Sequence, residues 1–130
     1  MKVIPIPLSV SAGLTGFASP ADSYVQKRLS LDDLLIRDQQ ASYFCRVSGN
    51  SMSDEAVIDG DILLVDRSLP VRQNSPIVCN YNGEMLYKRI DLANRLLLSS
   101  NEQFPPIPVS DTDTCSFEGV VTAVIRKMEL

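Results

Sequence analysis

The sequence predicts a small, mostly β domain, and three observations lead to this prediction. The chain has 130 residues and a mass of 14.3 kDa, which suits one domain with its own hydrophobic core. From residue 41 onward, short apolar segments with alternating polarity follow one another closely, separated by turn residues. Helical periodicity is confined to residues 30–36. Together these features favour a fold of small sheets built from short strands.

Residues 1–23 are predicted to form an irregular, flexible N-terminal arm. Pro5, Pro7 and Pro20 interrupt this segment, and serine, alanine and glycine fill its centre. Because proline lacks the N–H that a helix or a central strand requires, neither element is expected here. The domain proper is expected to cover residues 24–130.

One short helix and six strands are predicted after the arm. Ser30 followed by Asp33 is typical of a helix N-terminus, so we expect a helical turn over residues 30–36. Asn82-Gly83 between two β-rich runs predicts a hairpin, because both central positions of a type I′ turn need a positive φ. The expected strands lie in the segments ASYFCRVS, DGDILLVD, PIVCNY, EMLYKRI, RLLLSS and SFEGVVTAVIRKM. The loop before the last of them is marked by Pro105, Pro106 and Pro108.

The sequence contains no histidine, which excludes several kinds of site. Ser-His-Asp and Cys-His catalysis, and metal sites built on imidazole, all need that residue. Cys45, Cys79 and Cys115 are too widely spaced for a zinc knuckle, and we expect them to be reduced core thiols. Asp59 and Asp61 are expected to be turn residues, because two carboxylates alone make a poor cation site. No metal and no cofactor are expected.

Charge and hydropathy restrict the partners and the compartment. The formal net charge is −4 and the sequence has no basic block, which argues against direct DNA binding. No apolar stretch is long enough for a signal peptide or a membrane span. We therefore expect a soluble, cytoplasmic protein that does not contact nucleic acid or membrane directly.

A hydrolase without histidine needs another base for its nucleophile, and lysine can replace histidine when its amine is neutral. Lys88 shares one face of its expected strand with Leu86 and Ile90. Such a lysine either extends to solvent at the sheet edge or is desolvated within the fold. Ser51 is a candidate nucleophile because the Gly-Asn turn before it can direct backbone N–H groups outward. Residue pattern alone leaves the ordinary structural roles of both side chains open.

Several ordered motifs resemble the C-terminal domain of the LexA-type self-cleaving Ser-Lys peptidases. GNSM, IDGDILLVD, NGEMLYKRI and EGVV occur in this order, and the resemblance runs from about residue 15 to residue 124. Too few residues precede the expected cleavage site for a helix-turn-helix domain, so the chain resembles the UmuD-type SOS mutagenesis proteins of that superfamily. TGFASPADSYVQKRLSLDDLL resembles the UmuD-type segment around the cleaved bond. The resemblance implies a LexA/UmuD C-terminal-domain-like fold of short, strongly bent sheets.

The resemblance also implies roles for individual residues. Ser51 corresponds to the nucleophile and Lys88 to the general base. The oxyanion hole of the family corresponds to the backbone N–H groups of Asn50 and Ser51. With these roles, the resemblance implies a serine endopeptidase that acts on itself.

The bond that is cut is expected to lie within the arm. Alignment on the Ser-Pro pair that follows places it between Thr15 and Gly16. Threonine departs from the family pattern, which usually has alanine or cysteine before the glycine. Ala12-Gly13 has the expected chemistry three residues earlier and is the alternative.

The resemblance implies partners and a biological role. The resemblance implies that a RecA filament on single-stranded DNA promotes cleavage. The processed homodimer would then support a Y-family, UmuC-like subunit of a translesion polymerase. The sliding clamp is a further candidate partner. Signal peptidases also use a Ser-Lys pair, but the missing membrane span argues against them. The remaining alternative is a non-proteolytic binding module of the same fold that regulates a polymerase or a repressor.

Overall fold

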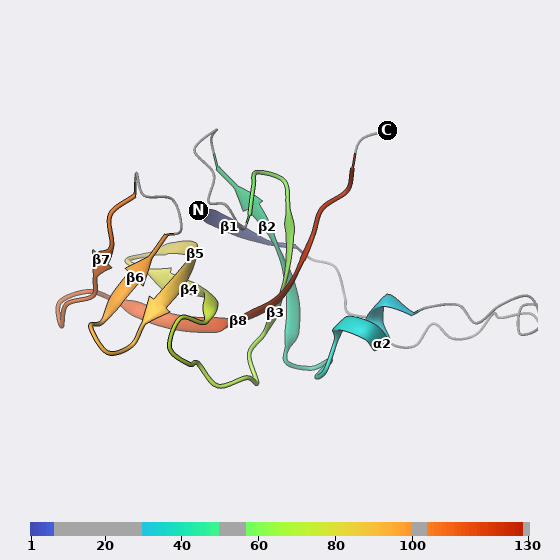
Figure 1. The fold of residues 1–130 in the computed structure, drawn as a ribbon, viewed down its shortest axis with the longest axis horizontal. Coiled ribbons are helices and arrows are strands. Elements are labelled where there is room, and N and C mark those ends of the chain that lie inside the picture. Colours follow the sequence, from blue (N-terminus) through green and yellow to red (C-terminus); the bar gives the residue numbers. More distant parts are fainter. Residues whose placement is uncertain (7–29, 50–56, 100–103, 129–130) are drawn as a thin grey trace, which may run out of the picture.

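The protein is described by a computed structural model that covers residues 1–6, 30–49, 57–99 and 104–128. In these residues the strands form one antiparallel sheet in the order β1-β2-β3-β8-β4-β5-β6-β7, and an additional pairing of β1 with β5 closes part of it into a barrel (Figure 1). The mostly β prediction is confirmed. The elements are β1 (Lys2–Ile6), α2 (Leu31–Leu35), β2 (Ser42–Ser48), β3 (Ile62–Asp66), β4 (Pro76–Tyr81), β5 (Glu84–Asp91), β6 (Leu96–Leu98), β7 (Ile107–Pro108) and β8 (Cys115–Ile125).

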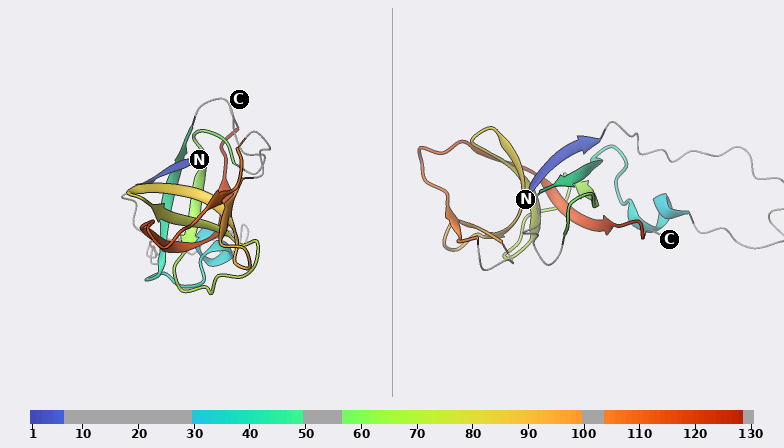
Figure 2. Two further views of the ribbon diagram at one scale, coloured as in Figure 1. Left: turned by 90° about the vertical axis from the view of Figure 1, so that its left-hand side faces the viewer. Right: turned by 90° about the horizontal axis from the view of Figure 1, so that it is seen from above.

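Strand β1 falls within the segment predicted to be an irregular arm, so that prediction is wrong for residues 2–6. The strand pairs with β2 along its whole length, and Lys2 lies opposite Leu86 of β5. Figure 2 shows β1 crossing between these two strands, where it completes the wall of the barrel. The rest of the predicted arm, residues 7–23, lies outside the described residues.

Pro5 fits in this strand because the pairing does not need its N–H. The backbone of Val47 in β2 faces β3, where its N–H donates to the Asp61 carbonyl and its carbonyl accepts from the Gly60 N–H, both at 2.8 Å. Alternation along β2 turns the backbone of Cys45, the partner of Pro5, in the same direction. Pro5 and Cys45 therefore form a non-hydrogen-bonded pair of the antiparallel ladder, and the missing N–H of the proline has no effect on pairing with β2.

Two local predictions are confirmed. The Ser30 hydroxyl accepts a hydrogen bond from the Asp33 N–H at 3.3 Å and caps α2. Asn82 and Gly83 have φ angles of 49° and 89° and join β4 to β5 as a hairpin. At the far edge of the sheet, Pro108 ends the short strand β7 where a loop was predicted; proline is tolerated there because an edge strand has one unpaired side.

The sheet buries apolar side chains in two clusters, and β5 contributes to both. The larger cluster includes Tyr87 of β5, and the smaller one includes Leu86. Since strand side chains alternate, Lys88 lies on the same face as Leu86. The other buried members of the larger cluster are Val3, Cys45, Val47, Val57, Leu63, Val65, Val78 and Val121, and those of the smaller cluster are Ile77, Cys79 and Leu97.

Among the described glycines, Gly119 in β8 is expected to be the least tolerant of substitution. Its φ is +140°, and an added Cβ would collide with Val65 Cγ1 and lie 3.2 Å from the Asp66 carbonyl oxygen. Gly119→Ala should therefore lower the free energy of unfolding by about 2–4 kcal/mol through backbone strain and overpacking. Gly83→Ala is the matched control, because Gly83 also has a positive φ but nothing lies within 4 Å of its added Cβ. Urea unfolding of both variants measures the difference, and equal losses would contradict the packing argument.

Candidate active site

Lys88 lies in the middle of β5, opposite Ile77 of β4, and is 7% exposed. Of the two possibilities that its strand position allowed, the buried one is therefore correct. Its Nζ lies 5.9 Å from the centroid of the Phe104 ring, and this ring is 40% exposed. Lys88 is thus buried, and its amine lies beside a ring that is itself at the surface of the fold.

Asn50 and Ser51 lie outside the described residues, but both ends of the segment that contains them are described. The Gly49 N–H donates to Asp59 Oδ1 at 3.0 Å, and this bond holds the chain at the start of the segment. At the other end, Val57 is fully buried in the larger apolar cluster. The chain therefore enters and leaves residues 50–56 at defined positions.

Met1 joins the start of this segment to the strand that carries Lys88. A Cβ on Gly49 would collide with Met1 Cε, so the methionine side chain lies directly against that glycine. The Met1 carbonyl accepts a hydrogen bond from the Tyr87 N–H at 2.7 Å. The residue before Asn50 and the residue before Lys88 thus contact the same methionine, although they are far apart in the sequence.

Asp61 has a buried carboxylate that forms an ion pair with Arg126, whose side chain is 42% exposed, and the sequence did not indicate this pair. Asp61 is 1% exposed, and its carboxylate accepts from Arg126 Nε at 2.8 Å and from Arg126 Nη2 at 2.6 Å. It also accepts from the Ile58 N–H at 2.9 Å. These bonds, that of Arg126 foremost, hold the pKa of Asp61 below its usual range. The pair fixes the turn directly after residues 50–56.

The prediction of turn residues for Asp59 and Asp61 is correct but incomplete. Gly60 between them has a φ of +89°, as a tight turn needs. The missed signal is the position of Asp61, next to the inward-facing run that begins at Ile62. A carboxylate buried at such a position needs a cationic partner, but nothing local in the sequence identifies Arg126 as that partner.

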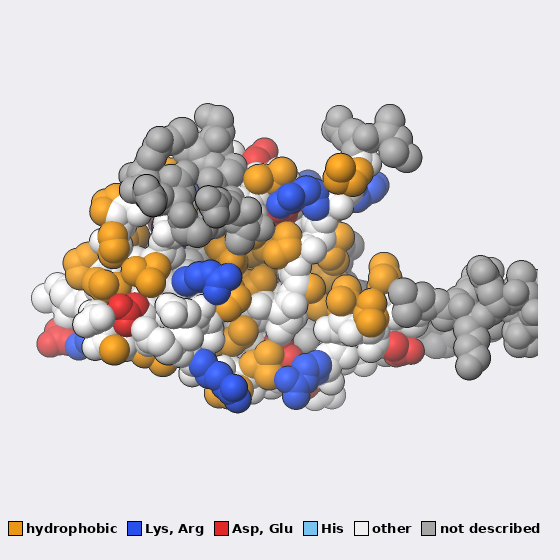
Figure 3. Space-filling view, viewed as in Figure 1, with side chains coloured by type: hydrophobic (Ala, Val, Ile, Leu, Met, Phe, Trp, Pro, Cys, Tyr) orange, Lys and Arg blue, Asp and Glu red, His pale blue; other side chains and the backbone are white. Residues whose placement is uncertain are grey.

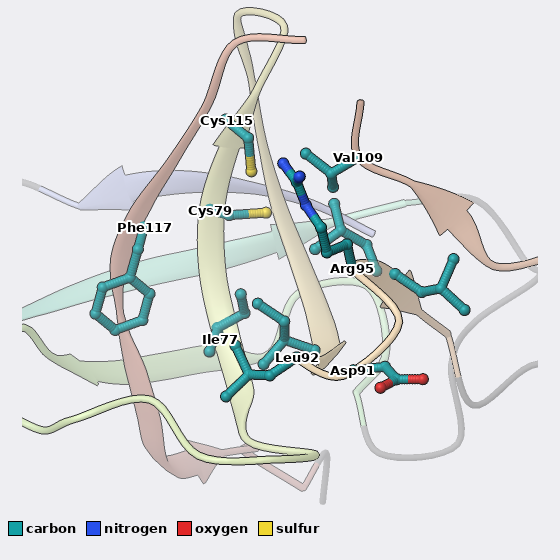
Figure 4. Close-up of a pocket in the computed structure, with 11 residues that line it drawn as sticks. Ile77, Cys79, Asp91, Leu92, Arg95, Val109, Cys115 and Phe117 are labelled. Carbon is teal, nitrogen blue, oxygen red and sulfur yellow. The ribbon is translucent and has the colours of Figure 1, made fainter. Parts of the chain in front are cut away.

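A hollow of about 290 Å³ lies between β4, β5, β6 and β8 (Figure 4). Its lining is mostly apolar, and Cys79 and Cys115 both direct their sulfur atoms into it. Cys115, the first residue of β8, is exposed, so the prediction of a core thiol is wrong for this residue. Among the described residues, no three His, Cys, Asp or Glu side chains are grouped closely enough to hold a metal ion.

The surface seen in Figure 3 mixes side chains of all kinds. Its Lys and Arg side chains are spread over the face rather than gathered in one block. No helix in the described part of the chain is long and apolar enough to cross a membrane. The candidate cleavage residues Thr15, Gly16, Ala12 and Gly13 lie outside the described residues.

Comparison with known proteins finds a matching family and several relatives. A family model described as Peptidase S24-like matches residues 5–122. Protein MucA of Salmonella typhimurium is 38% identical over 123 residues, which cover 93% of this chain and 84% of the relative. Protein ImpA of Shigella flexneri is 32% identical over 121 residues, covering 93% and 83%. The LexA repressor of Bordetella pertussis is 33% identical over 130 residues, covering 98% of this chain and 58% of the repressor.

Proposed function

Because the chain belongs to the peptidase S24-like family, as a UmuD-type member, we propose that it cuts its own N-terminal arm with a Ser51–Lys88 dyad. The observation that carries this proposal is the shared contact of Met1. It lies against Gly49, which begins the segment with Ser51, and bonds to Tyr87, which precedes Lys88. The burial of Lys88 adds support, since desolvation disfavours a charged amine.

In the proposed mechanism, the neutral amine of Lys88 takes the proton of the Ser51 hydroxyl. The Ser51 oxygen then attacks the carbonyl carbon of Thr15, and the N–H groups of Asn50 and Ser51 stabilise the resulting oxyanion. The lysine returns its proton to the departing amine of Gly16. Water then hydrolyses the acyl-enzyme with Lys88 again acting as base, and the serine is regenerated.

The proposed role is in SOS mutagenesis, in the cytoplasm. A RecA filament on single-stranded DNA would favour the conformation in which the arm occupies the site, which is a shift of population rather than added chemistry. The processed homodimer would then bind a Y-family, UmuC-like polymerase subunit, with the sliding clamp as a further partner. The net charge of −4 agrees with a role in which partners make the contacts to DNA.

The pH dependence of cleavage tests the chemistry. Purified protein is incubated from pH 7 to about pH 10 and its intact mass is followed. The rate should rise about tenfold per pH unit until the Lys88 amine is mostly neutral, and then level off. The chain has no histidine, and burial raises the pKa of the Cys45 thiol to about 11 and that of Cys79 to about 12, so none of these groups accounts for such a rise.

The product identifies the bond. A new N-terminus at Gly16 supports the proposed site, whereas a start at Gly13 keeps the mechanism and moves the bond to Ala12-Gly13. If no product forms at any pH, even with RecA, single-stranded DNA and nucleotide, the peptidase proposal fails. The non-proteolytic binding module would then be the better interpretation.

A further inference from the structure

Strand β1 precedes the proposed cleavage site in the chain but belongs to the barrel. It supplies five residue pairs to β2, and Val3 is 4% exposed within the larger apolar cluster. At its start, the Met1 carbonyl bonds to the Tyr87 N–H of β5 at 2.7 Å. A cut between residues 15 and 16 therefore separates a strand of the barrel from the rest covalently, while its contacts with β2 and β5 are left intact.

The two faces of β1 differ sharply. Val3 points into the apolar cluster, whereas its neighbour Ile4 is 55% exposed. Lys2 forms an ion pair with Glu84 at 3.5 Å, but both side chains are more than half exposed and the pair adds little. Backbone pairing with β2 and the burial of Val3 are therefore the main interactions that hold this strand in place.

Resting on the proposed function, we propose that cleavage does not itself release the arm. The fragment of residues 1–15 stays bound through β1, which occupies the groove between β2 and β5, and its dissociation is a separate, later step. The groove is thus a binding site for an extended strand that carries an apolar side chain at the position of Val3. Its occupant is this chain's own N-terminal segment, and its loss uncovers unpaired edges of β2 and β5.

The cysteines report on the occupancy of this groove. Cys45 lies opposite Pro5 and is fully buried in the barrel, where burial raises the pKa of its thiol to about 11. In the described sheet, β1 is the strand that joins β2 to β5, so its departure opens the interior around Cys45. Cys115 is exposed and Cys79 is buried in the other cluster, so they serve as positive and negative references.

The experiment separates strand retention from self-cleavage. The full chain carries Ser51→Ala, to prevent self-cutting, and a recognition sequence for a site-specific protease inserted between Thr15 and Gly16. After the cut, gel filtration with intact-mass detection should find both fragments in one peak, and iodoacetamide at pH 8 should modify Cys115 but not Cys45. Ile4→Asp should behave in the same way, whereas Val3→Asp should lose the peptide and expose Cys45 to modification.

A second experiment does not depend on how the Val3→Asp variant folds. A labelled synthetic peptide of residues 1–15 should exchange into the cut protein, whereas the same peptide with Val3→Asp should not. The proposal is overturned if the unsubstituted fragment leaves the body at once on cutting, if Cys45 becomes as reactive as Cys115, or if both peptides bind equally. These outcomes are independent of Ser51, so a wild-type chain that fails to cut itself would contradict the peptidase proposal through a different observation.

Discussion

Ser51→Ala and Lys88→Ala are each expected to reduce the rate of self-cleavage by about 10³-fold or more, to the limit of detection. Without the Ser51 hydroxyl no acyl-enzyme forms, and without the Lys88 amine the hydroxyl keeps its proton at neutral pH. The two losses should not add, since the residues act as a unit. Intact mass after incubation at about pH 9 measures the remaining product. The double variant should be no slower than either single one.

Matched variants distinguish chemistry from structure. Lys88→Met fills the same buried position without an amine. The variant should therefore melt within a few degrees of the wild-type protein and still lose cleavage. Lys127→Ala removes an exposed lysine and should cleave at the wild-type rate. Substantial cleavage by Lys88→Met would show that another group acts as the base. A slow Lys127→Ala variant would indicate a general effect of charge instead.

Asp61→Asn is expected to lower the free energy of unfolding by about 1–3 kcal/mol, because the carboxylate is buried but its arginine partner is partly screened by solvent. The carboxylate is 1% exposed and accepts two hydrogen bonds from Arg126, so the substitution breaks a charge-assisted contact between a buried carboxylate and a partly exposed arginine. Arg126→Ala should also destabilise the fold, because it leaves the buried carboxylate without its cation. Urea unfolding at pH 7 measures both effects. The exposed pair of Arg95 and Asp111, 3.2 Å apart, is the control, and Asp111→Asn should change nothing measurable.

The same pair predicts a dependence of stability on pH. The pKa of Asp61 in the folded protein lies below its value in the unfolded chain, which is about 3.9. Its contribution is therefore fully present above that unfolded value and is lost as the pH falls through the folded one. The difference in stability between wild type and Asp61→Asn should accordingly shrink on acidification below about pH 4. A difference that stays constant to pH 2 would mean that the charge of Asp61 does not support the fold.

Features that depend on neighbouring residues could be predicted from the sequence. The hairpin at Asn82-Gly83 and the cap at Ser30 are local effects of backbone conformation, and the structure has both. Strand β1 could not be predicted, because the tolerance of Pro5 depends on which way the backbone of β2 faces. The ion pair of Asp61 with Arg126 joins residues that are 65 positions apart in the sequence, and no local pattern couples them.

In the candidate site, too, local sequence predicts some features but not others. The strand face of Lys88 could be predicted from alternation with Leu86 and Ile90, and the residue is buried as one of the two interpretations required. Its link through Met1 to Gly49 could not, because it needs the barrel to close first. The dyad itself came from resemblance to a family rather than from physical pattern. It stays a prediction until the variants are measured.

The position of β8 in the sheet has a consequence for biosynthesis. This strand lies between β3 and β4, yet it leaves the ribosome after both of them. Until it emerges, the nascent chain has a gap in the barrel wall, and pairing across such long sequence separations is slow once the chain is complete. If the proposed Ser51–Lys88 site needs the closed barrel, it would therefore form only after translation is complete. The order of the strands would in this way protect the arm from being cut before the protein is finished.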